Sequence, residues 1–283
     1  HLRQDVRFSS GRAFTAADVK YSLERLLKPS IHSQGAEFFE EIEGAEEYAA
    51  GKADGVRGIV VTGPHRVDLV LTAPDLLFLH KLAMPFASVV DREAVDRHGD
   101  VGFARNPAGT GAFVFAEWVY GQRLRLARNP TYFRPERPYL DGVELSIGAS
   151  DQLAWFKYQR GELDISGIPS AEFTRVRADP RYRPVLLERT TLRTQYLGLN
   201  NELAPFDQVT VRQAMNFAVD KERLLDLIDR RGVVANGILP PDMPGYDPNR
   251  PVTYPYDPAA AIQYNTSGQP ASVRAQAYII AGH

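Results

Sequence analysis

The sequence predicts a mixed fold of helices and strands, of the α/β or α+β class. Two observations carry this prediction. Apolar residues recur at helical spacing in several segments, as Val19, Leu23 and Leu26 do before Pro29 ends the pattern. Elsewhere, short runs of β-branched residues are joined by turn residues, which is typical of hairpins. The mixture of the two patterns argues against a simple repeat architecture.

The first predicted helix begins shortly after a turn at Gly11. Thr15 is placed to cap this helix, and Asp18 stands three residues further on, where a capping box needs its acceptor. Phe14 precedes the cap and can pack against Val19 as a hydrophobic staple. The segment therefore predicts a strand end, a turn and a helix start, which any α/β protein could contain.

The remaining elements follow from the same two patterns. The predicted helices cover residues 36–50, 76–83, 151–160 and 209–219. The predicted strands cover residues 59–61, 67–71, 113–118, 123–127, 143–147 and 197–200. The first four strands form two hairpins, because turn residues rich in glycine separate the members of each pair. Asp151 is expected to cap its helix and Gly161 to end it, and the segment 237–258, rich in proline and glycine, predicts a loop.

Composition limits the class of protein. The chain has 283 residues, of which 44% are hydrophobic and 24% charged, and its net charge is −2. This charge favours neither nucleic acid nor an anionic membrane as a partner. No apolar run approaches the length of a membrane span. The absence of cysteine excludes disulfides, thiolate nucleophiles and cysteine-bound metals.

Catalytic and metal-binding patterns are absent from the sequence. The six histidines are not spaced as metal ligands, and no nucleophile elbow is present. The turn Gly109-Thr110-Gly111 lacks the lysine of a phosphate-binding loop, and the pair Glu46-Glu47 lies on a polar helix face. We therefore expect no catalytic residues, no metal site and no cofactor, and the chain is not expected to be an enzyme.

Several motifs together resemble one family. The run Phe8–Leu26 is followed in order by motifs at residues 106–113, 128–133, 138–143, 161–165 and 200–222, which include N-P-A-G-T-G, R-N-P-T-Y-F, P-Y-L-D-G-V and G-E-L-D-I. In this wording and order the chain resembles the family 5 extracellular solute-binding proteins, the oligopeptide, dipeptide and nickel receptors of ABC importers. Departures from the family pattern are small, and include Ser10, Ala112 and Phe133.

The resemblance implies an α/β, two-lobed fold of the periplasmic-binding-protein type (type II, cluster C-like), present here in incomplete form. It assigns residues 1–91 to a small accessory domain of the first lobe and residues 92–192 to the hinge-side part of that lobe. Residues 193–283 would begin the second lobe. Family members are about twice as long, so we expect segments to be missing at both ends.

The resemblance also predicts an interruption near residues 262–264. A helix begins at Pro258, but the family's pattern is lost after Ala261. Residues 264–267 resemble a strand end that the family places later, and a further helix is expected from about Pro270.

Ligand contacts are implied at three places: a loop after the first helix, the stretch after G-E-L-D-I, and the crossing into the second lobe. The candidate ligand-binding residues are His32, Gln34, Gly35, Ser166, Gly167, Ile168, Thr191, Arg193 and Tyr196. Gly35, Gly167 and Thr191 stand where oligopeptide receptors often have tyrosine, which predicts a larger or differently shaped cavity. In a strand through Leu197, alternation directs Tyr196 away from the core and toward the cleft between the lobes.

The resulting functional prediction is an extracytoplasmic receptor that delivers a peptide or another small solute to an ABC importer. Two lobes would close on the ligand, and membrane permease subunits would recognise the closed form. The expected location is periplasmic or extracellular, with a lipid anchor left open, and the expected state is a monomer. The alternative is a ligand-sensing domain of a regulatory protein with the same fold. An upstream helix-turn-helix segment would favour the regulator, and a signal peptide would favour transport.

Overall fold

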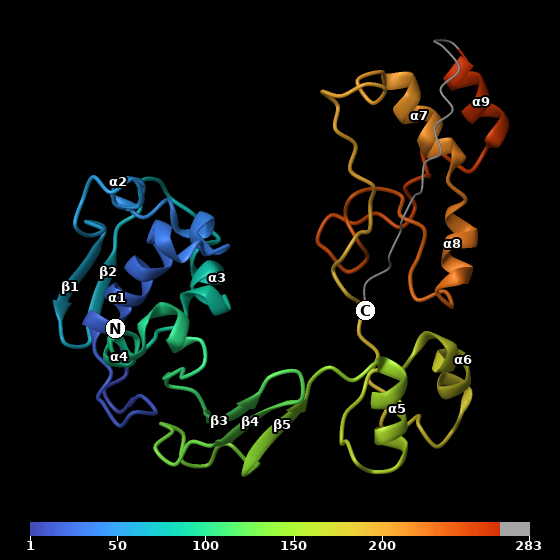
Figure 1. Cartoon of the computed structure of the whole chain (residues 1–283). Coiled ribbons are helices and arrows are strands. Elements are labelled where there is room, and N and C mark those ends of the chain that lie inside the picture. The colour runs from blue at the N-terminus through green and yellow to red at the C-terminus, as the bar shows by residue number, and fades with distance from the viewer. Residues whose placement is uncertain (267–283) are drawn as a thin grey trace. The chain divides into compact units, whose positions relative to one another are not determined.

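The computed structural model describes residues 1–266 of the chain. The chain divides into two units, His1–Ala149 and Ser150–His283 (Figure 1). The three-part division expected from the resemblance stays a prediction. Within the described residues, the structure contains no helix with the length and apolar character needed to cross a membrane.

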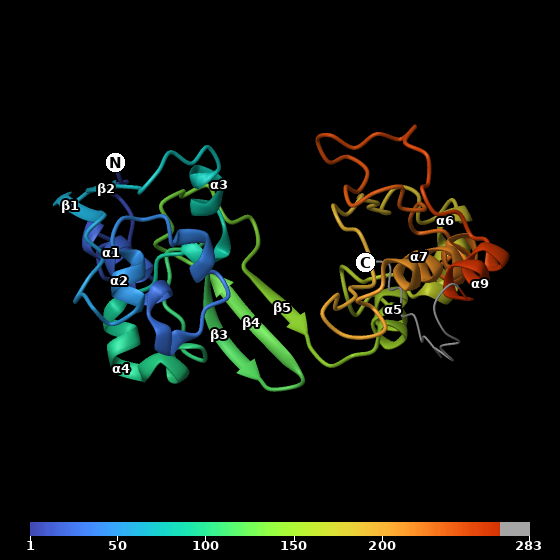
Figure 2. The ribbon, with the colours of Figure 1, turned by 90° about the horizontal axis from the view of Figure 1, so that it is seen from above.

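Helix α1 (Ala16–Leu27) forms as predicted and organises the first unit. The Asp18 carboxylate accepts a hydrogen bond of 2.8 Å from the backbone N–H of Thr15, which closes the predicted capping box. Leu23 and Leu27 are buried against a core that includes Phe39. The opposite wall of this core is the antiparallel hairpin that lies beside α1 (Figure 2).

The first unit continues with short elements around α1. In chain order they are the 3-10 helices η1 (Pro29–Ile31) and η2 (Ala36–Phe39), helix α2 (Ala45–Ala49), strands β1 (Ile59–Gly63) and β2 (Arg66–Leu69), helix α3 (Phe78–Leu82), the 3-10 helix η3 (Pro85–Ala87) and helix α4 (Arg92–Phe103). The first hairpin and the helix near residue 80 therefore confirm the sequence prediction. The continuous helix predicted over 36–50 is wrong. Ile42 forms a β-bridge with Leu71, and Gly44 has a left-handed φ of 83°, so the segment breaks between η2 and α2.

Helix α4 is absent from the sequence prediction. Its N-cap is Asp91, whose carboxylate accepts a hydrogen bond of 3.1 Å from the backbone N–H of Glu93. Gly99 has a φ of 68° and interrupts the helix before its end. The interruption spoils the apolar periodicity by which a helix of this length is otherwise found.

A polar cluster, here the Arg12 cluster, joins the start of α1 to the start of α4. Arg12 forms ion pairs with Asp18 at 2.5 Å and with Asp91 at 2.8 Å, and Ser10 donates a hydrogen bond of 2.5 Å to Asp91. Burial raises the pKa of Asp91, but the hydrogen bonds from Ser10 and Arg12 outweigh burial and hold this pKa below its ordinary value. Polar residues of the run Phe8–Leu26 therefore have a structural role in this chain, because Arg12 and Asp18 help to tie two helices together.

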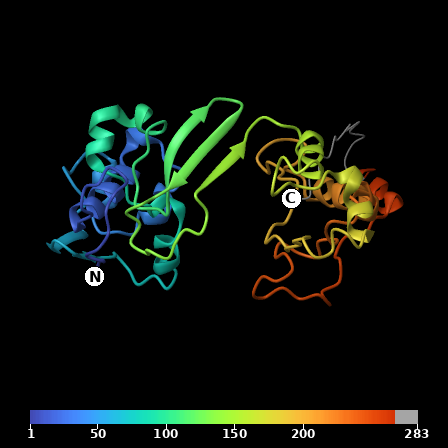
Figure 3. The same ribbon diagram turned by 90° about the horizontal axis from the view of Figure 1, so that it is seen from below.

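A second sheet completes the first unit. Its strands β3 (Phe113–Val119), β4 (Arg123–Arg128) and β5 (Gly142–Ser146) pair antiparallel in the order β3-β4-β5 (Figure 3). The predicted hairpin and the following strand are confirmed. Gly121, with a φ of 69°, supplies the left-handed turn between β3 and β4.

The second unit consists of helices and long irregular segments in its described part. The helices are α5 (Asp151–Gln159), α6 (Ser170–Ala178), α7 (Val209–Ala218), α8 (Lys221–Leu227) and α9 (Pro258–Thr266). Helices α5 and α7 and the loop before α9 confirm the prediction, whereas α6 and α8 were not predicted. Ser150, not Asp151, caps α5 by accepting a hydrogen bond of 3.3 Å from Leu153. Trp155 is buried, with its ring centroid 5.4 Å from those of Tyr158 and Tyr182.

Two predictions for the second unit are wrong. Residues 197–200 form no strand, and Leu197 is 43% exposed, so no neighbouring strand pairs with this segment in the described structure. Helix α9 does not stop after Ala261 but continues to Thr266. Packing explains its length, because the Tyr264 ring stacks on Phe217 of α7 with centroids 5.4 Å apart. The helix expected from Pro270 lies outside the described residues.

Candidate functional site

The first candidate segment is a tight turn in the first unit. His32 follows η1 in the left-handed conformation, with a φ of 50°, and its side chain is exposed, as is that of Gln34. The Ser33 hydroxyl accepts a hydrogen bond of 3.2 Å from the backbone N–H of Gly35. Gly35 is buried. These contacts fix the backbone of the turn and leave the two longer polar side chains in solvent.

Gly35 does not open a cavity. A Cβ atom built at this position would lie 2.2 Å from Cγ of Phe86, so the aromatic ring already fills the space. Phe86 also stacks on Phe38, with ring centroids 6.2 Å apart. The expectation of extra room at Gly35 is therefore wrong, because a residue distant in sequence packs onto the glycine.

The second candidate segment, Ser166–Ile168, lies between α5 and α6. The Ser166 hydroxyl donates a hydrogen bond of 2.9 Å to the carbonyl oxygen of Gly167. A Cβ atom at Gly167 would meet no heavy atom within 4 Å, so open space does lie beside this glycine. The carbonyl oxygen of Ile168 accepts a hydrogen bond of 3.2 Å from Nη2 of Arg231. This loop therefore has open space on the side of Gly167, while the Arg231 side chain is hydrogen-bonded to its backbone at Ile168.

The third candidate segment contains neither helix nor strand. The backbone N–H of Arg193 donates a hydrogen bond of 2.8 Å to the carbonyl oxygen of Thr191, and the Thr194 hydroxyl donates one of 2.8 Å to the carbonyl oxygen of Ile238. Tyr196 is 77% exposed. The alternation argument for its direction fails because there is no strand. Its exposure nevertheless agrees with a side chain that leaves the core.

The three segments are divided between the two units. His32, Gln34 and Gly35 belong to the first unit, and the remaining six candidates belong to the second. Among the described residues of the second unit, no hydrogen bond joins the Ser166–Ile168 loop to the segment 191–196. The Ser166–Ile168 loop is instead hydrogen-bonded to Arg231 in the turn that follows α8. The segment 191–196 is hydrogen-bonded to Ile238 in the long loop that precedes α9.

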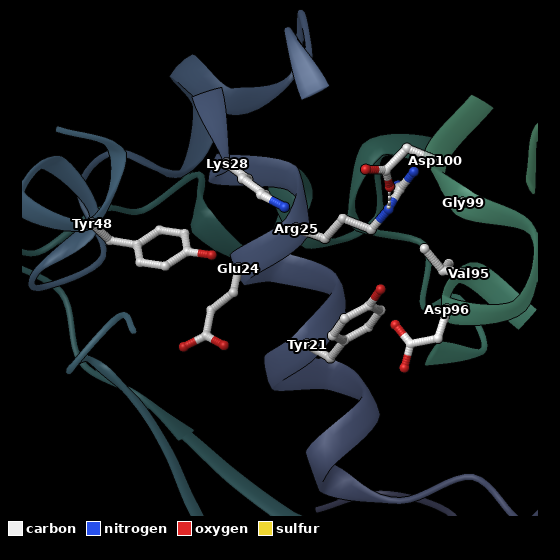
Figure 4. A pocket seen from close by; sticks show the side chains of 9 residues that line it. All are labelled: Tyr21, Glu24, Arg25, Lys28, Tyr48, Val95, Asp96, Gly99 and Asp100. Carbon is white, nitrogen blue, oxygen red and sulfur yellow. Dashed lines mark hydrogen bonds and ion pairs between the residues drawn. The ribbon is translucent and has the colours of Figure 1, made fainter. Parts of the chain in front are cut away.

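A pocket that the sequence did not predict lies within the first unit, between α1, α2 and α4 (Figure 4). Its volume is about 350 Å³. The lining residues are Tyr21, Glu24, Arg25, Lys28, Tyr48, Val95, Asp96, Gly99 and Asp100. Tyr21 of α1 is followed by Glu24 and Arg25 at spacings of three and four positions, so these residues share one helix face, and Lys28 is the C-cap of the helix. That spacing is a usable signal in the sequence, but the residues from α4 could not be added without predicting that helix.

The charges of this pocket are largely engaged with the protein itself. Arg25 forms an ion pair of 3.0 Å with Asp100, and Glu24 accepts a hydrogen bond of 2.9 Å from the backbone N–H of Val56. Burial, with a smaller contribution from Asp96, raises the pKa of Tyr21, and burial also raises the pKa of Tyr48. Both hydroxyls therefore remain protonated at neutral pH. The pocket belongs to none of the three segments that the resemblance assigns to a ligand.

The described residues contain no group of three or more histidine, aspartate or glutamate side chains that could hold a metal ion. The polar groups of the candidate segments are hydroxyls, the His32 imidazole, the Gln34 carboxamide, the Arg193 guanidinium and backbone amides. Groups of these kinds can hold a small molecule by hydrogen bonds.

Comparison with known proteins identifies the family. The model of the bacterial extracellular solute-binding proteins, family 5 (middle part), matches residues 1–267. Heme-binding protein A of Haemophilus influenzae is 30% identical over 277 residues, which are 93% of this chain and 49% of that protein. The dipeptide-binding protein of Escherichia coli is 29% identical, over 92% of this chain and 50% of that protein. The chain thus spans about half the length of these curated relatives.

Solved structures agree with the sequence comparisons. OppA of Burkholderia pseudomallei matches with a TM-score of 0.77 and 25% identity, over 94% of this chain and 53% of that chain. The predicted fold class, with helices and sheets arranged as in OppA-type periplasmic binding proteins, is confirmed over about half the length of such a protein. The chain therefore belongs to the bacterial extracellular solute-binding proteins of family 5.

Proposed function

We propose that the chain belongs to a receptor that binds a solute outside the cytoplasm and delivers it to the permease of an ABC importer. The match of residues 1–267 to the family 5 model carries this proposal. The names of the relatives support one class of ligand over others. They include heme-binding, dipeptide-binding and oligopeptide-binding proteins, and peptides dominate among them. We therefore propose a short peptide as the ligand, with heme as the first alternative to test.

The proposed ligand contacts come from the three candidate segments. In the second unit, Gly167 leaves open space beside the backbone, and Tyr196 presents an exposed ring with one hydroxyl. Arg193 is exposed and carries the planar donor group that suits a carboxylate, such as the C-terminus of a peptide. In the first unit, His32 and Gln34 contribute side chains, and Gly35 contributes by shaping the turn.

The proposed activity is binding without catalysis. Affinity would come from enclosing the ligand and satisfying its polar groups, and permease subunits in the membrane are the proposed partners. The proposed location is periplasmic or extracellular, with or without a lipid anchor. The proposed state is a monomer.

Native mass spectrometry of the full chain, purified without denaturation, tests the proposal directly. We expect a bound mass in the range of a short peptide. Titration calorimetry with dialanine, trialanine and heme then identifies the class. A ligand at a hundredfold excess over its Kd should raise the free energy of unfolding by about 2.7 kcal/mol. Absence of a bound mass, together with no heat and no stabilisation by any of the three compounds, would contradict the proposal.

A further inference from the structure

Arg231 directly follows a turn with an unusual backbone conformation. Helix α8 ends at Leu227, and Asp229 and Arg230 then adopt left-handed conformations, with φ values of 54° and 52°. The backbone N–H of Arg230 donates a hydrogen bond of 2.8 Å to the carbonyl oxygen of Leu225, which closes the turn. Residues other than glycine rarely adopt this conformation, and two in succession are held only where the surroundings require it.

The turn directs the Arg231 guanidinium onto the start of α6. Its central carbon lies 4.1 Å from the centroid of the Phe173 ring, so the planar group stacks on an aromatic face. The Nη2 atom donates hydrogen bonds to the carbonyl oxygens of Ile168 at 3.2 Å and Pro169 at 3.3 Å. One side chain thus holds both the end of the Ser166–Ile168 loop and the helix that follows it.

The side chains of the Ser166–Ile168 loop and of the preceding Ile165 make few contacts that would fix the backbone of the loop. Ile165 is 88% exposed, and within residues 1–266 the hydrogen-bond partner of the Ser166 hydroxyl is the carbonyl oxygen of the next residue. Gly167 has no side chain and leaves open space around its Cα. Glycine also loses the most conformational freedom when it is ordered. A loop of this kind costs free energy when a ligand has to order it, unless another group has already fixed the backbone.

We propose that Arg231 is a positioning residue that fixes the Ser166–Ile168 loop in the conformation that contacts the ligand. The inference rests on the proposed function for the ligand role of this loop. It rests on the contacts above for the role of Arg231. Lysine should replace the arginine only in part. Its ammonium group can donate a hydrogen bond to one of the two carbonyl oxygens, but it has no planar group to stack on Phe173 at the same time.

The test compares Arg231→Ala and Arg231→Lys with the control Arg177→Ala in the full chain. Arg177 also lies near Phe173, at 6.0 Å, but it is exposed and pairs with Glu188 at the surface. Backbone order parameters from ¹⁵N relaxation are measured at Gly167 and Ile168 and along α6. Trialanine affinity is measured by calorimetry, and the melting temperature is recorded for each variant.

In the wild type and in Arg177→Ala we expect order parameters at Gly167 and Ile168 near the rigid value of about 0.85. In Arg231→Ala they should fall below about 0.6, while α6 keeps its order. Trialanine affinity should fall about tenfold in this variant, and Arg231→Lys should lie between the two.

Three results would overturn the inference. The first is an unchanged order parameter at Gly167 and Ile168 in Arg231→Ala. The second is a loss of order along α6 with a lowered melting temperature, which would make Arg231 an ordinary stabilising residue. The third is a mobile loop with unchanged trialanine affinity. If the wild type binds no trialanine, dialanine or heme, the proposed function fails, and the order parameters still decide whether Arg231 positions the loop.

Discussion

Gly35 and Gly167 show how one residue type can have opposite roles in the same candidate site. A side chain at Gly35 would collide with Phe86, whereas a side chain at Gly167 would point into open space. Of the two glycines, Gly167 is therefore the one that leaves room beside the backbone for the proposed ligand. Gly35 is required by packing, so its substitution should lower the stability of the fold and should not act through the size of a ligand cavity.

Gly35→Ala should lower the free energy of unfolding by about 1–3 kcal/mol, because the new methyl group has to displace the Phe86 ring. Urea denaturation followed by circular dichroism measures this effect. Gly167→Ala is the matched control and should leave stability nearly unchanged. Equal stability of the two variants would show that Phe86 does not fill the space beside Gly35.

Tyr196→Ala should weaken ligand binding by about 1–3 kcal/mol if the ring is enclosed by the ligand, which is the range for an aromatic contact residue. The side chain is 77% exposed in the free protein, so the melting temperature should change little. Calorimetric titration with trialanine measures the affinity. Unchanged affinity, or a collapse of the melting temperature, would remove Tyr196 from the proposed site.

At the scale of elements, the contact between the starts of α1 and α4 depends on a charge. The pKa of Asp91 is lower in the folded protein than its ordinary value of 3.8. A carboxyl group with a lowered pKa stabilises the fold above its ordinary pKa, and this contribution is lost as the pH falls through the folded-state value. The first unit should therefore lose stability below about pH 4 as Asp91 takes up a proton.

Asp91→Asn should lower the free energy of unfolding at pH 7 by about 1–3 kcal/mol and flatten its dependence on pH in the acid range. Asparagine is also a good N-cap, so helix α4 keeps its cap, and the change removes the carboxylate charge that Arg12 and Ser10 contact. Urea denaturation between pH 3 and pH 7 measures the effect. Asp5→Asn, at an exposed ion pair with Arg3, is the control and should behave as the wild type. A variant as stable as the wild type at pH 7 would refute the role of this pair.

Local sequence patterns predict the elements whose contacts join residues that are close together in the sequence. The hairpins around Gly63 and Gly121 and the cap of α1 at Thr15 were found because their turn and cap residues lie within a few positions of what they bind. The strand at 197–200 was wrong because a strand needs a partner, and no local signal reports its absence. The break at Gly44 and the filling of Gly35 by Phe86 likewise depend on distant residues. The family motifs predict which residues are candidates for ligand contact, but they do not predict which other residues pack against those candidates.

At the scale of the whole molecule, the three-stranded sheet has two different faces. Cross-strand pairing places Trp118, Leu124 and Leu145 in one row, and Phe115, Leu126 and Val143 in the next row of the same face. The opposite face carries the charged row Glu117, Arg125 and Glu144. Trp118 is 42% exposed and Leu145 47% exposed, so the apolar face is open to solvent in part.

An open apolar face should bind an apolar dye. We expect anilinonaphthalene sulfonate to fluoresce with the native chain. The double variant Trp118→Lys, Leu145→Lys should reduce this fluorescence several-fold, while Glu144→Lys on the charged face should not. Dye fluorescence that is absent from the native chain, or equal in the double variant, would show that the apolar face is covered.

The Arg12 cluster also has a consequence for how the chain reaches its fold. Arg12 and Asp91 are separated by 79 residues, whereas Arg12 and Asp18 are separated by six. During synthesis the cap of α1 can therefore form early, but the charge pair is complete only after Asp91 has left the ribosome. Closing so long a loop costs entropy, so this contact forms late in folding. Contacts that form after the rate-limiting step mainly slow unfolding. We therefore expect the contact between Arg12 and Asp91 to slow the unfolding of the first unit more than it speeds its folding.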